Sequence, residues 1–224
     1  MSCMSTLQWY ELIPVLSFLG LQGRCRSCKT KISIQYPLVE LTTGLLFGVL
    51  FYKFQSLLLV NINLFAVTYA YFVVMFSILL VIVVYDIKHK IIPDTLSFAF
   101  GGLAFLSLFF FTPNGLTFHV PTILQLLSGA LIALPFYLLW LLSGGRWMGL
   151  GDGKLALGLG WFLGFATALS GIVIAFWVGA IIGIALIFLT KGYRMKTEIP
   201  FAPYLALGAF IAFIWELNLF QIYF

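Results

Sequence analysis

Long apolar runs follow one another along the chain, and they constrain its fold more than any other feature. A transmembrane helix needs roughly 20 predominantly apolar residues, and only helices or closed barrels satisfy their own backbone hydrogen bonds in lipid. We therefore expect an all-α, polytopic membrane protein with a loop over 1–36 and a helical membrane domain over 37–224. The runs predict about seven spans, at residues 37–54, 65–86, 95–112, 121–142, 153–168, 170–190 and 201–222.

The composition excludes an ordinary soluble domain. Of the 224 residues, 62% are hydrophobic and 8% are charged, and the mean hydropathy is +1.11, whereas soluble domains carry about 25% charged residues. Residues 1–11 lack a basic stretch followed by an apolar run, so we expect no cleavable secretory signal. The apolar segment 56–64 either extends the second span or lies in the membrane interface, and Pro113-Asn114-Gly115 predicts a turn.

The basic residues indicate how the chain crosses the membrane. A net charge of +5 is compatible with nucleic-acid binding, but Lys and Arg lie in short segments between the apolar runs, as the positive-inside rule expects. With the predicted spans, every one of the 12 Lys and Arg residues except Lys53 falls on one side. We therefore predict that this side is cytoplasmic, that the protein lies in the inner membrane, and that its partners include no nucleic acid.

Two aspartates stand at ends of predicted spans on that side. Asp86 ends the second span, and Asp152 opens the fifth within Gly149-Leu150-Gly151-Asp152-Gly153-Lys154. A carboxylate beside a span is costly and therefore a candidate functional residue. Two carboxylates held close together share a proton, so that one activates a water while the other hydrogen-bonds a scissile carbonyl. Spacing alone fits equally well a structural role, in which both aspartates cap or snorkel at span ends beside Lys88 and Lys154.

Glycines and a third aspartate surround this pair in the sequence. Glycines beside Asp152 would let a substrate backbone approach closely. Asp94 follows Pro93 at the start of the third span, where we predict a helix cap, with a substrate contact as the alternative. A small proton-coupled transporter would use the same aspartates as a relay. Such carriers often contain inverted repeats and helices interrupted at mid-membrane, and we see no repeat in the sequence.

Three cysteines, Cys3, Cys25 and Cys28, lie in the amino-terminal loop. An odd number in one loop on the predicted cytoplasmic side argues against a disulfide framework. The spacing of Cys25 and Cys28 lets both thiolates reach one tetrahedral zinc ion, with Cys3 as a third ligand. A fourth ligand is not evident, although His89 lies in another loop on that side. Zinc binding and uncoordinated thiols therefore both remain open.

Several separate segments, in this order, resemble the bacterial type IV prepilin peptidases, which are aspartyl proteases of the Gly-x-Gly-Asp type. The resemblance covers nearly the whole chain. The segments are Glu11-Leu12-Ile13-Pro14-Val15-Leu16-Ser17, Gly23-Arg24-Cys25-Arg26-Ser27-Cys28, Tyr36-Pro37-Leu38-Val39-Glu40-Leu41, Asp86 with Ile92-Pro93-Asp94, Gly149-Leu150-Gly151-Asp152-Gly153-Lys154, and Ile199-Pro200-Phe201-Ala202-Pro203-Tyr204-Leu205.

The resemblance implies an intramembrane endopeptidase whose catalytic aspartates are Asp86 and Asp152. Its substrates would be type IV prepilins and pseudopilins, cut on the cytoplasmic side after the glycine that ends a short basic leader. Many members also methylate the new amino terminus with S-adenosylmethionine. Glu40 lies near the region that the family links to methyl transfer, and capping of a helix start is the equally weighted alternative.

Two departures from the family pattern affect the amino-terminal loop. Members with the zinc-type loop carry two C-x-x-C pairs, and Cys3 matches the second cysteine of the first pair, so that its partner would precede Met1. The family usually has one more span before this loop, eight in all. A start codon placed too late in the sequence and the loss of this helix are two explanations for the missing span. The departures bear on zinc binding and methyl transfer more than on proteolysis, and an inactive truncated relative is a third interpretation.

Overall fold

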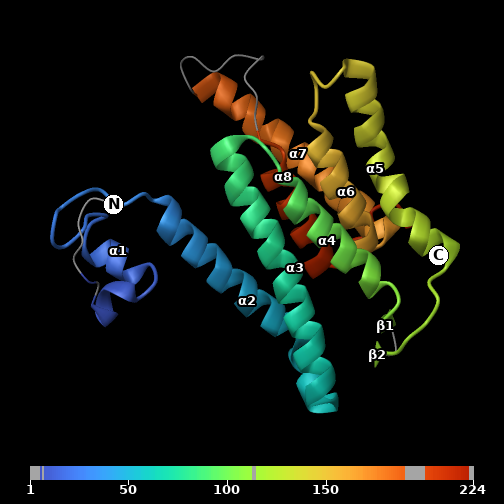
Figure 1. Ribbon diagram of the computed structural model, residues 1–224, viewed down its shortest axis with the longest axis horizontal. Coiled ribbons are helices and arrows are strands. Elements are labelled where there is room, and N and C mark those ends of the chain that lie inside the picture. Colours follow the sequence, from blue (N-terminus) through green and yellow to red (C-terminus); the bar gives the residue numbers. More distant parts are fainter. Residues whose placement is uncertain (1–5, 7, 113–114, 190–199, 222–224) are drawn as a thin grey trace. The chain divides into compact units, whose positions relative to one another are not determined.

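The computed structural model describes residues 6, 8–112, 115–189 and 200–221 (Figure 1). The chain divides into two compact units, Met1–Gln55 and Ser56–Phe224, and each is described by itself. The turn at Pro113-Asn114-Gly115 falls mostly outside the described residues, as do three basic residues on the predicted cytoplasmic side, Lys191, Arg194 and Lys196. The division into a loop over 1–36 and a membrane domain over 37–224 stays a prediction.

The first unit contains the 3-10 helix η1 (Trp9–Leu12), the short helix α1 (Leu16–Gly20) and most of α2 (Gln35–Val60). Between α1 and α2 the chain folds back on itself, because Arg24 and Lys31 form an isolated antiparallel β-bridge. Gly23 permits this turn: its φ is +68°, a left-handed conformation that other residues resist, and a Cβ there would lie 3.0 Å from the Phe18 ring. A hydrogen bond of 2.9 Å from the Val15 N–H to the Glu40 carboxylate ties the loop to α2.

The structure corrects two expectations around α2, one of them only in part. The helix begins at Gln35, so Glu40 lies in its second turn and binds the Val15 N–H instead of capping the helix start. The helix also continues to Val60, so residues 56–60 extend the first predicted span, whereas Ile62–Leu64 belong to α3 and extend the second span as predicted. Asn61 then separates α2 from α3, because its side chain accepts hydrogen bonds from the N–H groups of Asn63 and Leu64.

The second unit is a bundle of helices, so the prediction of an all-α, polytopic fold is confirmed. The helix α6 packs most extensively on α4 and α5, while α8 packs on α7 and α3. The short strands β1 (Phe111–Thr112) and β2 (Gly115–Leu116) pair antiparallel around the predicted turn. The helices are α3 (Ile62–His89), α4 (Asp94–Ser107), α5 (Ile123–Ser143), α6 (Leu150–Leu163), α7 (Phe165–Leu189) and α8 (Ala202–Ile214).

Each predicted span corresponds to one helix, from α2 to α8, but the helices differ in length. Within the described residues, α2, α3, α5 and the Phe165–Leu186 part of α7 are long and apolar enough to cross a membrane. The helices α4, α6 and α8 have 14, 14 and 13 residues, which at 1.5 Å per residue gives about 20 Å against a hydrocarbon core of about 30 Å. These three are therefore shorter than predicted.

Backbone conformation explains two of the displaced boundaries. Gly164, with a φ of +76°, ends α6, so the break falls there and not near residue 169. The helix α8 stops at Ile214, and Glu216 soon after it has a left-handed φ of +50°. Both breaks lie inside apolar stretches, where hydropathy alone does not mark them.

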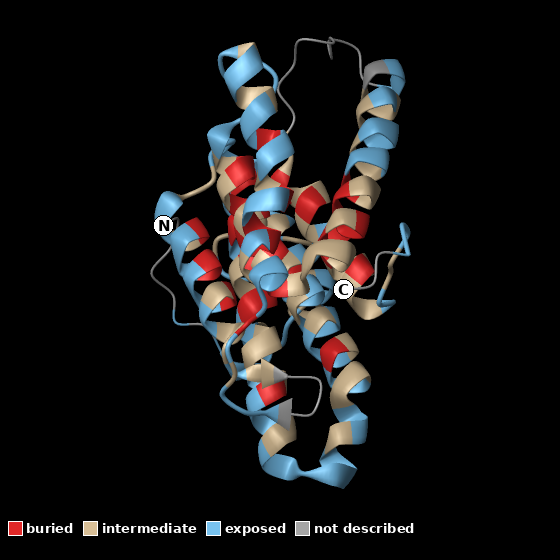
Figure 2. Ribbon diagram, turned by 90° about the vertical axis from the view of Figure 1, so that its right-hand side faces the viewer, coloured by how far each residue is buried: buried red, intermediate tan, exposed pale blue. Residues whose placement is uncertain are grey.

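Phenylalanines and glycines bring the helices of the second unit together, beside buried Leu, Ile and Ala side chains. Phe162 of α6 lies 5.3 Å from Phe76 of α3 and 5.6 Å from Phe100 of α4, measured between ring centroids. Glycines bring backbones together: a Cβ on Gly208 of α8 would lie 2.2 Å from the Gly171 carbonyl oxygen of α7. Buried residues gather midway along these helices, whereas much of the outer surface is exposed and apolar (Figure 2), as lipid contact requires.

Candidate active site

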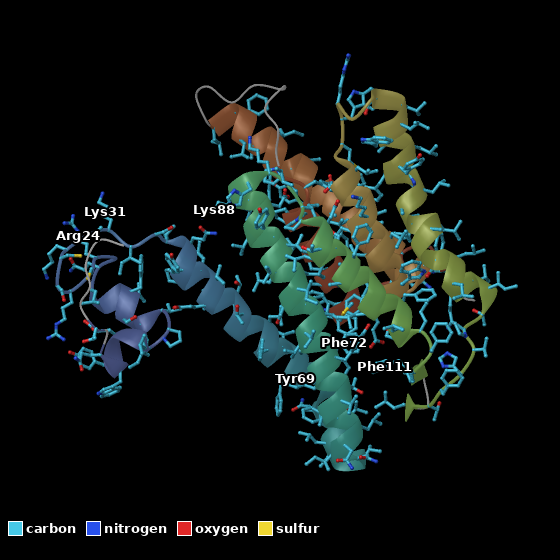
Figure 3. All side chains as sticks on the ribbon, viewed as in Figure 1. Arg24, Lys31, Tyr69, Phe72, Lys88 and Phe111 are labelled. Carbon is cyan, nitrogen blue, oxygen red and sulfur yellow. The ribbon has the colours of Figure 1, made fainter. Side chains whose placement is uncertain are left out.

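Asp86 and Asp152 come from two helices that end and begin at the same end of the second unit. Asp86 is in the last turn of α3 and Asp152 in the first turn of α6. In Figure 3, Lys88 marks this end of α3, while Tyr69 and Phe72 lie towards the other end. The side chains of the two aspartates are buried, with only 5% and 9% of their surfaces exposed. They are close enough to interact electrostatically, so the structure brings the predicted pair together.

Asp86 is held by the start of the last helix. Its Oδ2 atom accepts a hydrogen bond of 3.1 Å from the backbone N–H of Ala202, the first residue of α8. The N–H groups at a helix start carry partial positive charge and attract carboxylates. Asp86 therefore does take part in capping, as the structural alternative supposed, but it caps a helix 116 residues later in the chain. The sequence does not indicate this contact, because the two residues are far apart in the chain. It does indicate the start of α8, because Pro203 is typical of the first turn of a helix.

Asp152 is held by its own helix start. The backbone N–H of Gly149, which precedes α6, donates a hydrogen bond to the Asp152 carboxylate. A Cβ on Gly149 would lie 3.6 Å from Asp152 Oδ2. A Cβ on Gly151 would lie 3.0 Å from Cβ of Ile92, so the segment before α4 occupies the space that this missing side chain leaves. At Gly151 the close approach that we expected from a substrate is made by Ile92.

Asp94 lies apart from the buried pair and forms an ion pair instead of a cap. It is the first residue of α4, which begins without a side-chain cap, so the capping prediction is wrong. Its Oδ1 atom lies 2.7 Å from Nζ of Lys154, and the two side chains are 59% and 28% exposed. Lys154 therefore neutralises Asp94 across the interface between α4 and α6 and forms no ion pair with Asp152.

The cysteine turn, residues 25–30, is a compact local structure in the first unit. The Cys25 N–H donates to the Thr30 carbonyl at 2.9 Å and the Lys29 N–H to the Cys25 carbonyl at 3.0 Å. Both thiols are half-buried, and the Cys28 thiol donates to Thr30 Oγ1 at 3.2 Å.

These two thiols supply only half of the donors that a tetrahedral zinc site needs. Within the described residues no group of three or more His, Cys, Asp or Glu side chains gathers at one point. Cys3 lies outside the described residues, and His89 lies against the Tyr85 ring, 4.5 Å away in α3. The zinc site of Cys3, Cys25 and Cys28 stays a prediction, and no chemistry is derived from it.

Known proteins resemble the chain over both units. Residues 1–54 match the bacterial peptidase A24 N-terminal domain, and residues 73–184 match the type IV leader peptidase family. The prepilin leader peptidase/N-methyltransferase of Aeromonas salmonicida is 35% identical over 95% of this chain and 69% of its own length. Proteins with the same name from Xanthomonas campestris and Pseudomonas aeruginosa are 34% and 32% identical, over 93% and 95% of this chain and 69% of their own lengths. No solved structure matches it.

A helical membrane bundle with a buried pair of aspartates, matched by these sequences, belongs to the class of membrane-embedded peptidases. The chain is a member of the type IV leader peptidase family. The prediction of a peptidase is thereby confirmed, and the transporter interpretation is not favoured.

Proposed function

We propose that the chain is an intramembrane aspartyl endopeptidase that removes the short basic leader from type IV prepilins and pseudopilins. The observation that carries this proposal is the placement of Asp86 and Asp152, two buried carboxylates from α3 and α6 that interact electrostatically. The names of the relatives, prepilin leader peptidase/N-methyltransferase, support the choice of substrate.

The pair would catalyse hydrolysis without a covalent intermediate. Two carboxylates held close together share one proton, since two adjacent negative charges repel each other. The ionised member takes a proton from a water, whose oxygen attacks the scissile carbonyl carbon, while the other member gives its proton to the carbonyl oxygen. The tetrahedral intermediate then loses its amine: the aspartate that took the proton from water gives it to the nitrogen as the C–N bond breaks. One hydroxyl of the intermediate gives its proton to the other aspartate and becomes the carbonyl of the new carboxyl group, so the pair again holds one proton. One water is consumed.

Backbone contacts keep both carboxylates in place for this chemistry. The Ala202 N–H fixes Asp86 and the Gly149 N–H fixes Asp152, so neither side chain depends on a flexible partner. Because Lys88 and Lys90 lie at this end of α3 and Lys154 at this end of α6, the positive-inside rule supports a cytoplasmic position for the pair. The leader would meet the site from that side of the inner membrane.

We extend the proposal to methylation of the new amino terminus with S-adenosylmethionine, because the relatives' names include N-methyltransferase. In the first unit, Tyr10 and Glu11 line a cavity of about 200 Å³, below the roughly 300–1,000 Å³ of most ligand sites. This cavity is therefore too small to hold the whole cofactor, and no step of methyl transfer is derived.

The test is cleavage of a prepilin from the same organism by this chain in membranes, followed by mass spectrometry. Wild type is compared with Asp152→Asn, which keeps the side-chain shape and removes the proton chemistry. We expect loss of the leader with the wild type alone, and one added methylene on the product if the second activity is present. An intact prepilin with a folded wild type would refute the proposal and favour an inactive relative.

A further inference from the structure

Two cations, Arg24 and Lys31, flank the cysteine turn and lie directly opposite each other. They form the antiparallel β-bridge of the first unit, and both are labelled in Figure 3. The backbone hydrogen bonds beside this bridge, of 2.9 and 2.8 Å, join the neighbours of the two residues and not the residues themselves. In such a non-hydrogen-bonded pair the Cα atoms are about 4.5 Å apart and the side chains leave on one face. Both residues are exposed, so two positive charges are held close together at the surface.

The acidic residues of the first unit do not neutralise this cation pair. Like charges directly opposite each other on paired strands repel and destabilise the pairing. Residues 1–55 contain two acidic residues. Glu11 accepts a hydrogen bond of 2.8 Å from the Gln8 N–H, and Glu40 one of 2.9 Å from the Val15 N–H. Among the described residues neither cation has an ion-pair partner. An anion from outside the first unit would relieve the repulsion.

Arg26, on the same turn, is held within the unit. Its guanidinium donates to the Tyr10 hydroxyl and lies 5.3 Å from the centre of the Tyr10 ring. A hydrogen bond and a cation–π contact therefore account for this charge. The side chains of Arg24 and Lys31 make no comparable contact with a residue that the structure describes. Arg26 is thus a matched cation with an internal role.

The cation pair lies close to the start of a helix that is able to cross the membrane. Lys31 precedes Gln35, the first residue of α2, by four residues, which span at most about 14 Å. The 26 residues of α2 include a stretch apolar enough to cross a membrane. At about 39 Å the helix is longer than the hydrocarbon core of about 30 Å, so its ends reach the headgroup layers. Tyr36 in its first turn is 68% exposed, as is typical of aromatic residues at a membrane surface.

We propose that Arg24 and Lys31 bind the phosphate of an anionic phospholipid in the leaflet that holds the start of α2. A guanidinium binds two phosphate oxygens at once, and an ammonium adds a second positive charge. Free phosphate offers the same chemistry, but lipid headgroups are concentrated where α2 enters the membrane. The basic leader of the proposed substrate would be repelled by the two cations. The bound lipid would hold the amino-terminal loop at the membrane surface.

The test is binding of dioctanoyl phosphatidylglycerol to the full chain in neutral detergent, followed by native mass spectrometry. From the usual contribution of one basic residue near anionic lipid, Arg24→Gln and Lys31→Gln should each weaken binding about fivefold, and the double variant about 30-fold. Arg26→Gln removes the same charge from the same turn and should change the affinity less than twofold. The exchange Arg24→Lys with Lys31→Arg keeps both charges and should bind as the wild type does.

Thermal unfolding in the same detergent separates binding from folding. Without anionic lipid, Lys31→Gln should not lower the Tm, because it removes a repulsion. Added phosphatidylglycerol should raise the Tm of the wild type and not that of the double variant. A lower Tm of Lys31→Gln without lipid would overturn the proposal and assign the pair a structural role.

Three binding results would also overturn the proposal. The double variant could bind the lipid as tightly as the wild type does. Arg26→Gln could weaken binding as much as Arg24→Gln does, which would mean that only net charge matters. Inorganic phosphate at the same concentration as the lipid could displace it, which would assign the two cations to a free phosphate ion.

Discussion

The aspartate end of the second unit and the cysteine turn of the first unit hold their polar groups in different ways. Asp86 and Asp152 are buried, and their carboxylates are fixed by backbone N–H groups at the starts of α8 and α6. The thiols of Cys25 and Cys28 are half-buried, and backbone hydrogen bonds between Cys25, Lys29 and Thr30 close their turn. The first site joins helices that are far apart in the chain, whereas the second lies within the amino-terminal loop, where Arg26 of the turn also contacts Tyr10.

The role of the aspartate end is tested most directly by replacing each aspartate of the buried pair. We expect Asp86→Asn and Asp152→Asn each to lower cleavage by about 10²–10⁴-fold, because each removes the acid/base chemistry of the pair. Cleavage in membranes with the amount of inserted protein measured in parallel checks this. Asp94→Asn makes the same chemical change outside the pair and serves as the control. If Asp94→Asn abolished cleavage while Asp86→Asn remained active, the assignment of the catalytic pair would be wrong.

A second prediction tests whether the bundle as a whole supports the aspartate end. Gly208→Ala would place a Cβ 2.2 Å from the Gly171 carbonyl oxygen, so α7 and α8 would have to separate. We expect a loss of about 1–3 kcal/mol in unfolding free energy together with weaker cleavage, because α8 supplies the N–H that holds Asp86. Thermal unfolding in detergent measures the loss. Gly102→Ala, where the new Cβ has open space, should be neutral; equal effects of the two changes would argue against this packing.

The ion pair between α4 and α6 should have a smaller effect. Both side chains are partly exposed, and such pairs stabilise by about 0–1 kcal/mol. We expect Lys154→Met to reduce cleavage by only a few-fold, since the pair holds α4 beside α6 without touching the buried aspartates. Exchange of the two charges, Asp94→Lys with Lys154→Asp, should recover most of the loss. Failure of the exchange to recover activity would indicate that one of the two residues contacts the substrate directly.

The smallest effect on proteolysis should come from the cysteine turn. Cys25→Ser keeps the backbone hydrogen bonds of the turn, so cleavage should stay within about twofold, as for most surface substitutions. Methylation should fall before cleavage does. Mass spectrometry of the product follows both activities in one sample. Complete loss of cleavage by a normally expressed Cys25→Ser protein would show that the two sites are not independent.

The sequence predicts the helical membrane fold and the buried aspartate pair because both depend on gross polarity. Apolar runs separated by basic loops indicate spans, and a carboxylate at the edge of such a run is conspicuous. What polarity does not reveal is partner choice. The capping rule for Asp94 considers only neighbours in sequence, whereas its actual partner, Lys154, is 60 residues away. The contact between Asp86 and Ala202 was missed for the same reason.

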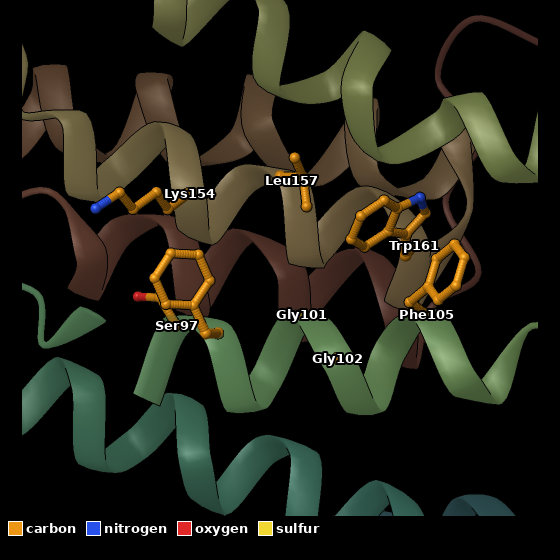
Figure 4. A pocket seen from close by; sticks show the side chains of 8 residues that line it. Ser97, Gly101, Gly102, Phe105, Lys154, Leu157 and Trp161 are labelled. Atoms are coloured by element: carbon orange, nitrogen blue, oxygen red, sulfur yellow. The ribbon is translucent and has the colours of Figure 1, made fainter. Parts of the chain in front are cut away.

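Backbone breaks inside apolar stretches were also beyond prediction. Gly164 interrupts a continuous hydrophobic run, and averaging hydropathy over a window hides a single residue with positive φ. The cavity of about 400 Å³ that Ser97, Gly101 and Trp161 line also lies between α4 and α6 (Figure 4). This cavity does not exist until α4 and α6 pack together.

The hydrogen bond between Ala202 and Asp86 also affects when the protein becomes competent during synthesis. The donor is made 116 residues after the carboxylate, which at ribosomal rates of 5–20 residues per second is a delay of roughly 6–23 s. Throughout that interval Asp86 is already in the nascent chain without the group that holds it in position. The arrangement of Asp86 is therefore incomplete until the start of α8 has been synthesised.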